Sequence, residues 1–146
     1  MASFNKINQF VEDLASGVHQ LQTGTSHTLK VYLSNATPDA AADAVKSDLA
    51  EISGGNGYTS GGATIGTITG AETSGTFKLV GSADPSWTAS GGTIGPFRYA
   101  VLYNDTPTSP ADPLIGWWDY GSSITLAIGE SFTVDLDGSN GVLQIT

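Results

Sequence analysis

The chain has 146 residues, no cysteine and a formal net charge of −9, from fourteen acidic and five basic side chains. This length fits a single domain with a substantial core, and an apolar fraction of 39% argues against disorder. The acid excess disfavours binding to nucleic acid or to an anionic membrane, and the lack of cysteine excludes disulfides and cysteine-ligated zinc.

The first segment places apolar residues at helical spacing. This pattern predicts an amphipathic helix over residues 3–21, with Ser3 as its N-cap, Gly17 weakening its interior and Gly24 just beyond its end. The helix is expected to pack on the body of the domain or to dock on a neighbouring subunit. Its apolar stripe consists of Phe4, Ile7, Phe10, Val11, Leu14, Val18 and Leu21.

The same segment lacks the apolar run of a signal peptide and carries Glu12 and Asp13 where that run would lie. No stretch of the chain approaches the roughly 18 apolar residues of a membrane span. We therefore expect folding in a cytoplasm.

Alternation predicts the first strand over Thr28–Ser34, with Leu29, Val31 and Leu33 on one face and Lys30 and Tyr32 on the other. Helix formers then predict one further short helix over Ala40–Ile52.

Ser53–Gly70 is rich in glycine but lacks the spacing of a phosphate-binding loop, so its glycines are expected to supply positive φ and mobility. Three further strands are predicted around and after it, over Ala63–Thr69, Thr76–Val80 and Trp87–Ala89.

The last third has the strongest strand signals. One predicted strand, Phe97–Asn104, places Phe97, Tyr99, Val101 and Tyr103 on a single face. The loop 105–113, with three prolines, separates it from four shorter predicted strands: Leu114–Tyr120, Ile124–Ile128, Phe132–Leu136 and Val142–Ile145.

Short strands with regular turn signals predict a mainly β (α+β) fold, an antiparallel β-sandwich or a small β-barrel or jelly-roll-like body. One domain is expected over 1–146, with a helix and linker in 1–24 and the β-rich body in 25–146. The predicted core of its last third comprises Phe97, Tyr99, Val101, Trp118, Ile124, Leu126, Phe132, Val134 and Leu136.

Sequence patterns for catalysis or metal binding are weak. His19 and His27 are isolated from each other and from any helical metal-site partner. The run from Asp135 to Asn140 resembles part of a calcium loop, but a hairpin turn explains it better because position 6 is not glycine and position 12 is Thr146.

Two patterns leave a carbohydrate-directed role open. A pair of carboxylates for glycoside hydrolysis would come from Asp105, Asp112, Asp119 or Glu130. A sugar-binding platform would use Trp87, Trp117, Trp118 or Tyr120, although alternation sends Trp117 and Trp118 to opposite faces.

Arg98 is the last basic residue of the chain and lies within a predicted strand. It is expected to form an internal ion pair, with Asp119 as a partner, and the alternative is a contact across a subunit interface.

Five runs follow one another along the chain: MASFNKINQFVEDLASGVHQL, TLKVYLSNATP, DLAEISGGNGYTSGG, SGGTIGPFRYAVLYND and PLIGWWDYGSSITLAIGESFTVDLDG. In this order they resemble small virion proteins of tailed bacteriophages. The likeness covers nearly the whole chain, and it is one of overall order and short runs rather than of an active-site signature.

The resemblance implies a non-enzymatic structural protein without cofactor or metal, most simply a capsid decoration (cement) protein. Its expected partners are the major capsid protein and itself, as a homo-oligomer with a trimer favoured, and its expected place is the capsid exterior after assembly in the bacterial cytoplasm. Candidate interface residues are Phe4, Ile7, Phe10, Val11, Leu14, Asn56, Tyr58, Pro107, Pro110 and Arg98.

Two alternatives remain at this point. One is a tail or head-fibre component, or a receptor-binding β-domain that contacts host glycans. The other is a glycan hydrolase.

Overall fold

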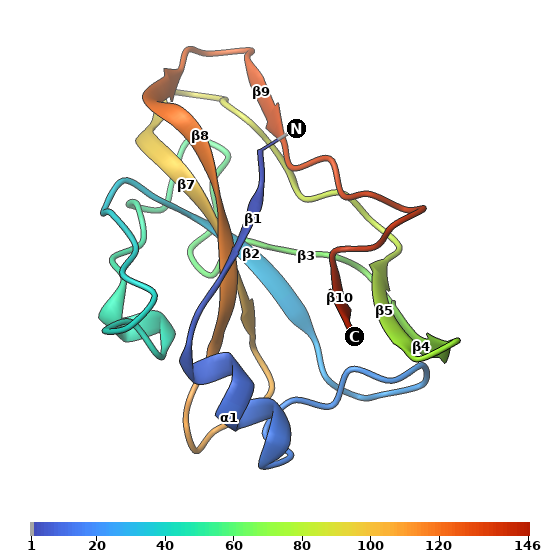
Figure 1. Cartoon of the computed structure of the whole chain (residues 1–146). Coiled ribbons are helices and arrows are strands. Elements are labelled where there is room, and N and C mark those ends of the chain that lie inside the picture. The colour runs from blue at the N-terminus through green and yellow to red at the C-terminus, as the bar shows by residue number, and fades with distance from the viewer. Residues whose placement is uncertain (1) are drawn as a thin grey trace.

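The computed structural model describes residues 2–146 and shows a mainly β protein built from three antiparallel sheets. The largest sheet has the order β1-β8-β7-β2-β3, the second β10-β5-β4 and the third β6-β9. Figure 1 shows the long strands β7 and β8 at the centre, with β4, β5 and β10 to one side. The strands are β1 (Phe4–Lys6), β2 (Leu29–Ser34), β3 (Ala63–Thr64), β4 (Ile68–Thr73), β5 (Thr76–Gly81), β6 (Ser86–Thr88), β7 (Ile94–Asn104), β8 (Leu114–Leu126), β9 (Ser131–Thr133) and β10 (Leu143–Ile145).

The large sheet is buried on both faces. One face packs against the two smaller sheets, around a core that includes Leu79, Phe97 and Ile115. The other face carries a second cluster, with Tyr32, Val101 and Tyr103 among its members. The sandwich-like packing agrees with the predicted fold class in part, and the described strands do not close into a barrel.

Residues 40–51, here called the covering segment, lie over this second cluster. Leu49 is buried within it, and the Tyr32 hydroxyl donates a hydrogen bond of 3.0 Å to the Leu49 carbonyl. In Figure 1 the segment lies on the opposite side of the sheet from β4 and β5. This cover explains why Tyr32, predicted on the face opposite Leu29, Val31 and Leu33, is fully buried.

The predicted helix over residues 3–21 is wrong in extent. Residues 4–6 form β1, which pairs with β8, and the helix α1 covers only Gln9–Ala15. Gly17, at φ +78°, ends the helix: its amide bonds the Leu14 carbonyl and the next amide bonds the Asp13 carbonyl. This is the Schellman motif, which favours glycine because the backbone at this position adopts the left-handed conformation. Ser3 therefore caps no helix.

The second predicted helix, Ala40–Ile52, is reduced to one 3₁₀ turn, Lys46–Asp48. Aspartate side chains bond the backbone amides that a helix would have used. Asp39 accepts from Ala41 and Ala42, and Asp48 accepts from the amides of Ala44 and Val45. Such local bonds compete with helix formation.

Bulges change two predictions in the last third. The predicted strands 114–120 and 124–128 are one strand, β8, whose register against β7 slips between Asp119 and Ile124. The same irregularity places Phe97 and Tyr99 in different clusters, so they do not share the predicted face. A bulge adds residues to one strand, so alternation fails across it.

Most of the predicted core residues of this region are buried, and Trp118, Ile124 and Phe132 are only half-buried. The glycine-rich run also serves close packing, because a side chain on Gly62 would collide with the backbone of Val31. The remaining predicted strands lie within three residues of the observed bounds, except that Ala63–Thr69 divides into β3 and the start of β4.

Candidate interaction surface

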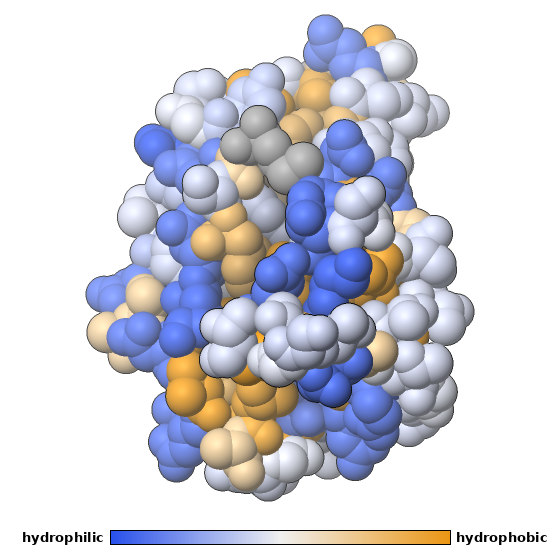
Figure 2. Space-filling view, turned by 45° about the vertical axis from the view of Figure 1, so that its right-hand side comes forward, coloured by the Kyte–Doolittle hydropathy of each residue, from blue (hydrophilic) through white to orange (hydrophobic). Residues whose placement is uncertain are grey.

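Along one side of the sandwich, between the edge strands β1 and β10, lie four of the five predicted interface residues of the N-terminal segment: Phe4, Phe10, Val11 and Leu14. Three adjoining hollows follow this side, and we call it the open side. β1 and the residues before it contribute to all three: Ala2 to the upper and middle hollows, Phe4 to the middle and lower ones, and Lys6 to the lower one. Figure 2 looks toward this side and shows apolar areas, the largest at the bottom, where α1 lies.

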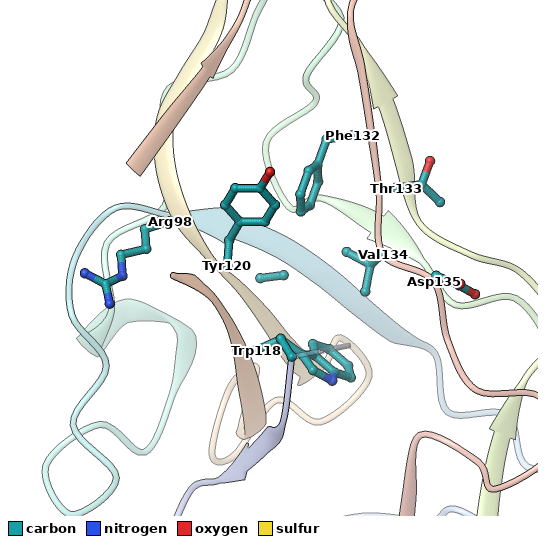
Figure 3. Close-up of a pocket in the computed structure, with 9 residues that line it drawn as sticks. Arg98, Trp118, Tyr120, Phe132, Thr133, Val134 and Asp135 are labelled. Atoms are coloured by element: carbon teal, nitrogen blue, oxygen red, sulfur yellow. The ribbon is translucent and has the colours of Figure 1, made fainter. Parts of the chain in front are cut away.

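The upper hollow, of about 210 Å³, is lined by aromatic rings. Tyr120 is 55% exposed, and its ring centroid lies 5.8 Å from that of Phe132 in an edge-to-face arrangement. In Figure 3 the rings of Tyr120, Phe132 and Trp118 and the side chain of Val134 surround the same space. β8 supplies Trp118 and Tyr120, two residues apart and therefore on one face, as the alternation predicts.

Polar groups at the upper hollow point away from it. The Arg98 guanidinium pairs with the Asp119 carboxylate through bonds of 2.8 and 2.9 Å, which confirms the predicted ion pair. This bond lowers the pKa of Asp119 and raises that of Arg98. Figure 3 shows Arg98 directed away from the rings. The hollow is therefore an apolar aromatic slot with a charged rim.

The lower hollow, of about 550 Å³, is a groove between two sheet edges and the helix. One wall holds Phe4 and the α1 residues Phe10, Val11 and Leu14, and the other is β10. Val11 is 53% exposed, Phe4 and Leu14 are half-buried, and Phe10 is buried. Residues of the apolar stripe predicted from helical spacing thus line this groove, but they come from β1 and the short helix α1 rather than from one long helix.

The other predicted interface residues lie elsewhere. Ile7 and Tyr58 are buried inside the subunit, so in this conformation they are not available to a partner. Asn56 is exposed, but its side-chain amide bonds the Thr93 carbonyl at 3.0 Å. Pro107 is half-buried and Pro110 exposed, both in the 105–113 loop.

Tyr58 belongs to a polar network that fixes the covering segment. Its hydroxyl donates to the Glu51 carboxylate at 2.7 Å and accepts from the Leu33 amide at 3.0 Å. Glu51 also accepts from the Gly61 amide and from Lys46, each at 2.6 Å. Burial, followed by the hydrogen bond to Glu51, raises the pKa of Tyr58 well above its usual value. The network makes Glu51 a structural carboxylate.

The two histidines, isolated in sequence, meet at Asn104. The Asn104 amide nitrogen lies 3.2 Å from Nδ1 of His19 and 2.9 Å from Nδ1 of His27, so this one amide joins the two rings. Burial lowers the pKa of His19 to about 4, against a raising effect of Asp13 and with a further lowering by His27. Sequence reasoning missed this cluster because its members lie on different elements.

Other groups weighed for chemistry have structural partners. Asp105 pairs with Lys30 at 2.8 Å, and Glu130 accepts from the Ala127 amide. Asp137 accepts from the amides of Ser139 and Asn140, which supports the turn interpretation and lowers its pKa. Burial raises the pKa of Asp112. Within residues 2–146 no three His, Asp or Glu side chains gather as metal ligands, and no helix is both long and apolar enough to span a membrane.

Scans of protein-family models, of curated proteins and of solved structures found no match to this chain.

Proposed function

We propose that this chain is a non-enzymatic structural protein of a tailed bacteriophage, a capsid decoration protein that binds the major capsid protein on the outside of the head. The observation that carries the proposal is the open side, where apolar and aromatic side chains line adjoining hollows along a sheet edge. Contiguous apolar surface of this kind is typical of protein–protein contact sites.

The sequence resemblance and the charge support the same role. A net charge of −9 suits the capsid exterior, away from the packaged DNA. Decoration at threefold points of the capsid lattice favours a homotrimer, which sedimentation of the purified protein would detect.

The experiment removes and restores the protein on particles of the phage that encodes it. Particles stripped of it are expected to lose thermal or osmotic stability, and adding the purified protein is expected to restore both. An electron-microscopy reconstruction is expected to show it at capsomer junctions. Full stability of the stripped particles, with the protein found only on tails, would overturn the proposal.

A tail or fibre component that contacts host glycans is the second candidate. Exposed Tyr120 beside Trp118 favours it, because aromatic faces also receive sugar rings. Arg98, the one basic residue that lines the slot, bonds Asp119 rather than turning into the slot, which favours the protein partner. Binding on a glycan array that disappears with Tyr120→Ser would select the second candidate.

Glycan hydrolysis ranks below both. Turnover of cell-wall or capsule substrates that depended on Asp119 or Glu130 would contradict a non-enzymatic role.

A further inference from the structure

Two sheet edges face the open side with their backbone groups free. β1 pairs only with β8, and β10 pairs only with β5, so each is the last strand of its sheet. In the part of the chain from residue 2 to 146, neither strand makes a further backbone hydrogen bond on its outer edge. Unpaired donors and acceptors in a row are a template for another strand.

The hollows lie beside these free edges. The lower groove is bounded by Phe4 and Lys6 of β1 and by all three residues of β10, and the aromatic slot begins at Ala2. An extended peptide presents backbone groups along its length and directs alternate side chains to opposite faces. Edge bonds together with apolar hollows are the two elements of recognition by strand addition. A sugar would use the hollows but not the edges.

The surrounding charge defines the partner further. Two acids line the hollows: Asp135 the upper and middle ones, and Asp137 the middle one. Exposed Asp135 lines the aromatic slot, and the one base there, Arg98, is already neutralised by Asp119. Lys6 is the single base at the lower groove. Basic side chains on a partner would complement this acidic side.

We propose that the open side binds an extended segment of a partner protein in which apolar and basic residues alternate, and that this segment adds to the sheet at β1. Its apolar side chains enter the aromatic slot and the lower groove, and its basic side chains, on the opposite face of the added strand, complement the net charge of −9 of the chain. The inference rests on the proposed function only in taking the partner to be a protein.

The probe is a capped peptide, VRVRVRV, titrated into the full chain while tryptophan fluorescence and backbone amide signals are followed. Binding is expected with shifts at Phe4–Lys6, and VEVEVEV is expected to bind at least tenfold more weakly at low salt. Two further peptides carry N-methyl groups on all valines or on all arginines, and each set blocks one edge of the strand. One of the two is expected to lose binding.

A matched pair of variants tests the location. Tyr120→Ser is expected to weaken VRVRVRV binding at least tenfold, and Ile128→Ser, which removes an apolar side chain that is 68% exposed outside the hollows, is expected to leave it unchanged. Equal binding of all four peptides, or equal weakening by both variants, would overturn the inference. No peptide binding by a protein that still restores stripped particles would overturn it and leave the capsid role standing.

Discussion

The covered face of the large sheet and the open side of the sandwich differ in how their polar groups are satisfied. The covering segment is held by a network in which Glu51, Tyr58 and Lys46 satisfy one another. The open side has half-buried rings, a three-residue edge strand and free backbone groups. Since unsatisfied groups are costly only when they are buried from water, the open side is tolerated as a solvated surface and gains most from a partner. The difference separates scaffold from contact surface, and four predictions test it.

The largest effect is expected on the covered side. Glu51→Ala leaves Lys46, the Tyr58 hydroxyl and the Gly61 amide without their shared partner. We expect the free energy of unfolding to fall by about 3–5 kcal/mol in denaturant titration. Glu12→Ala, which removes an exposed carboxylate on α1, is the control and is expected to change it by less than about 0.5 kcal/mol. Similar losses from both would show that the network is not what holds the covering segment.

The second effect depends on pH and concerns the segment that carries α1. The pKa of His19 is 6.5 when unperturbed and about 4 in the folded protein, so the unfolded chain binds the proton more tightly. The contribution of neutral His19 to the free energy of unfolding is fully present above pH 6.5. It falls as the pH drops toward 4, by at most about 3 kcal/mol.

The measurement is denaturant unfolding at pH 7 and pH 4.5 for the wild type and for His19→Gln. The carboxylates that titrate over this range change the free energy of unfolding of both proteins equally, so the difference between the two proteins isolates the contribution of His19. An identical pH dependence in the two proteins would contradict the buried neutral histidine.

The third effect tests β1. Phe4 is half-buried, and its ring centroid lies 5.0 Å from that of Trp118. We expect Phe4→Ala to cost about 2 kcal/mol and to speed amide exchange where β1 pairs with β8. Val11→Ala, on the exposed part of α1, is expected to do neither. Faster exchange in α1 instead of β8 would favour the continuous helix that spacing predicts.

The smallest effect on stability is expected at the aromatic slot. Tyr120→Ser removes a ring that is 55% exposed, so the free energy of unfolding is expected to change by less than about 0.5 kcal/mol while partner binding is lost. A large loss of stability in Tyr120→Ser would show that Tyr120 stabilises the fold rather than forming part of a contact surface.

Local patterns predicted much of the β structure because alternation and turn residues act over a few neighbours. β2 and β5 lie close to their predicted bounds, and Arg98 meets Asp119 as expected. The apolar stripe of residues 3–21 correctly marked residues that are buried or half-buried, except for Val11, but it did not mark one continuous helix. Phe4 reaches the open side from a strand and Leu14 from a helix, so residues at helical spacing in the sequence adopt two different conformations.

The sequence by itself determined a single β-rich acidic chain with turns at its glycines and an internal ion pair for its last arginine. Only the tertiary structure decided which faces are buried, where β1 ends and α1 begins, and that His19, His27 and Asn104 meet. The reason is physical: propensity and periodicity are local, whereas bulges, strand pairing and the desolvation of a side chain depend on neighbours far away in the chain.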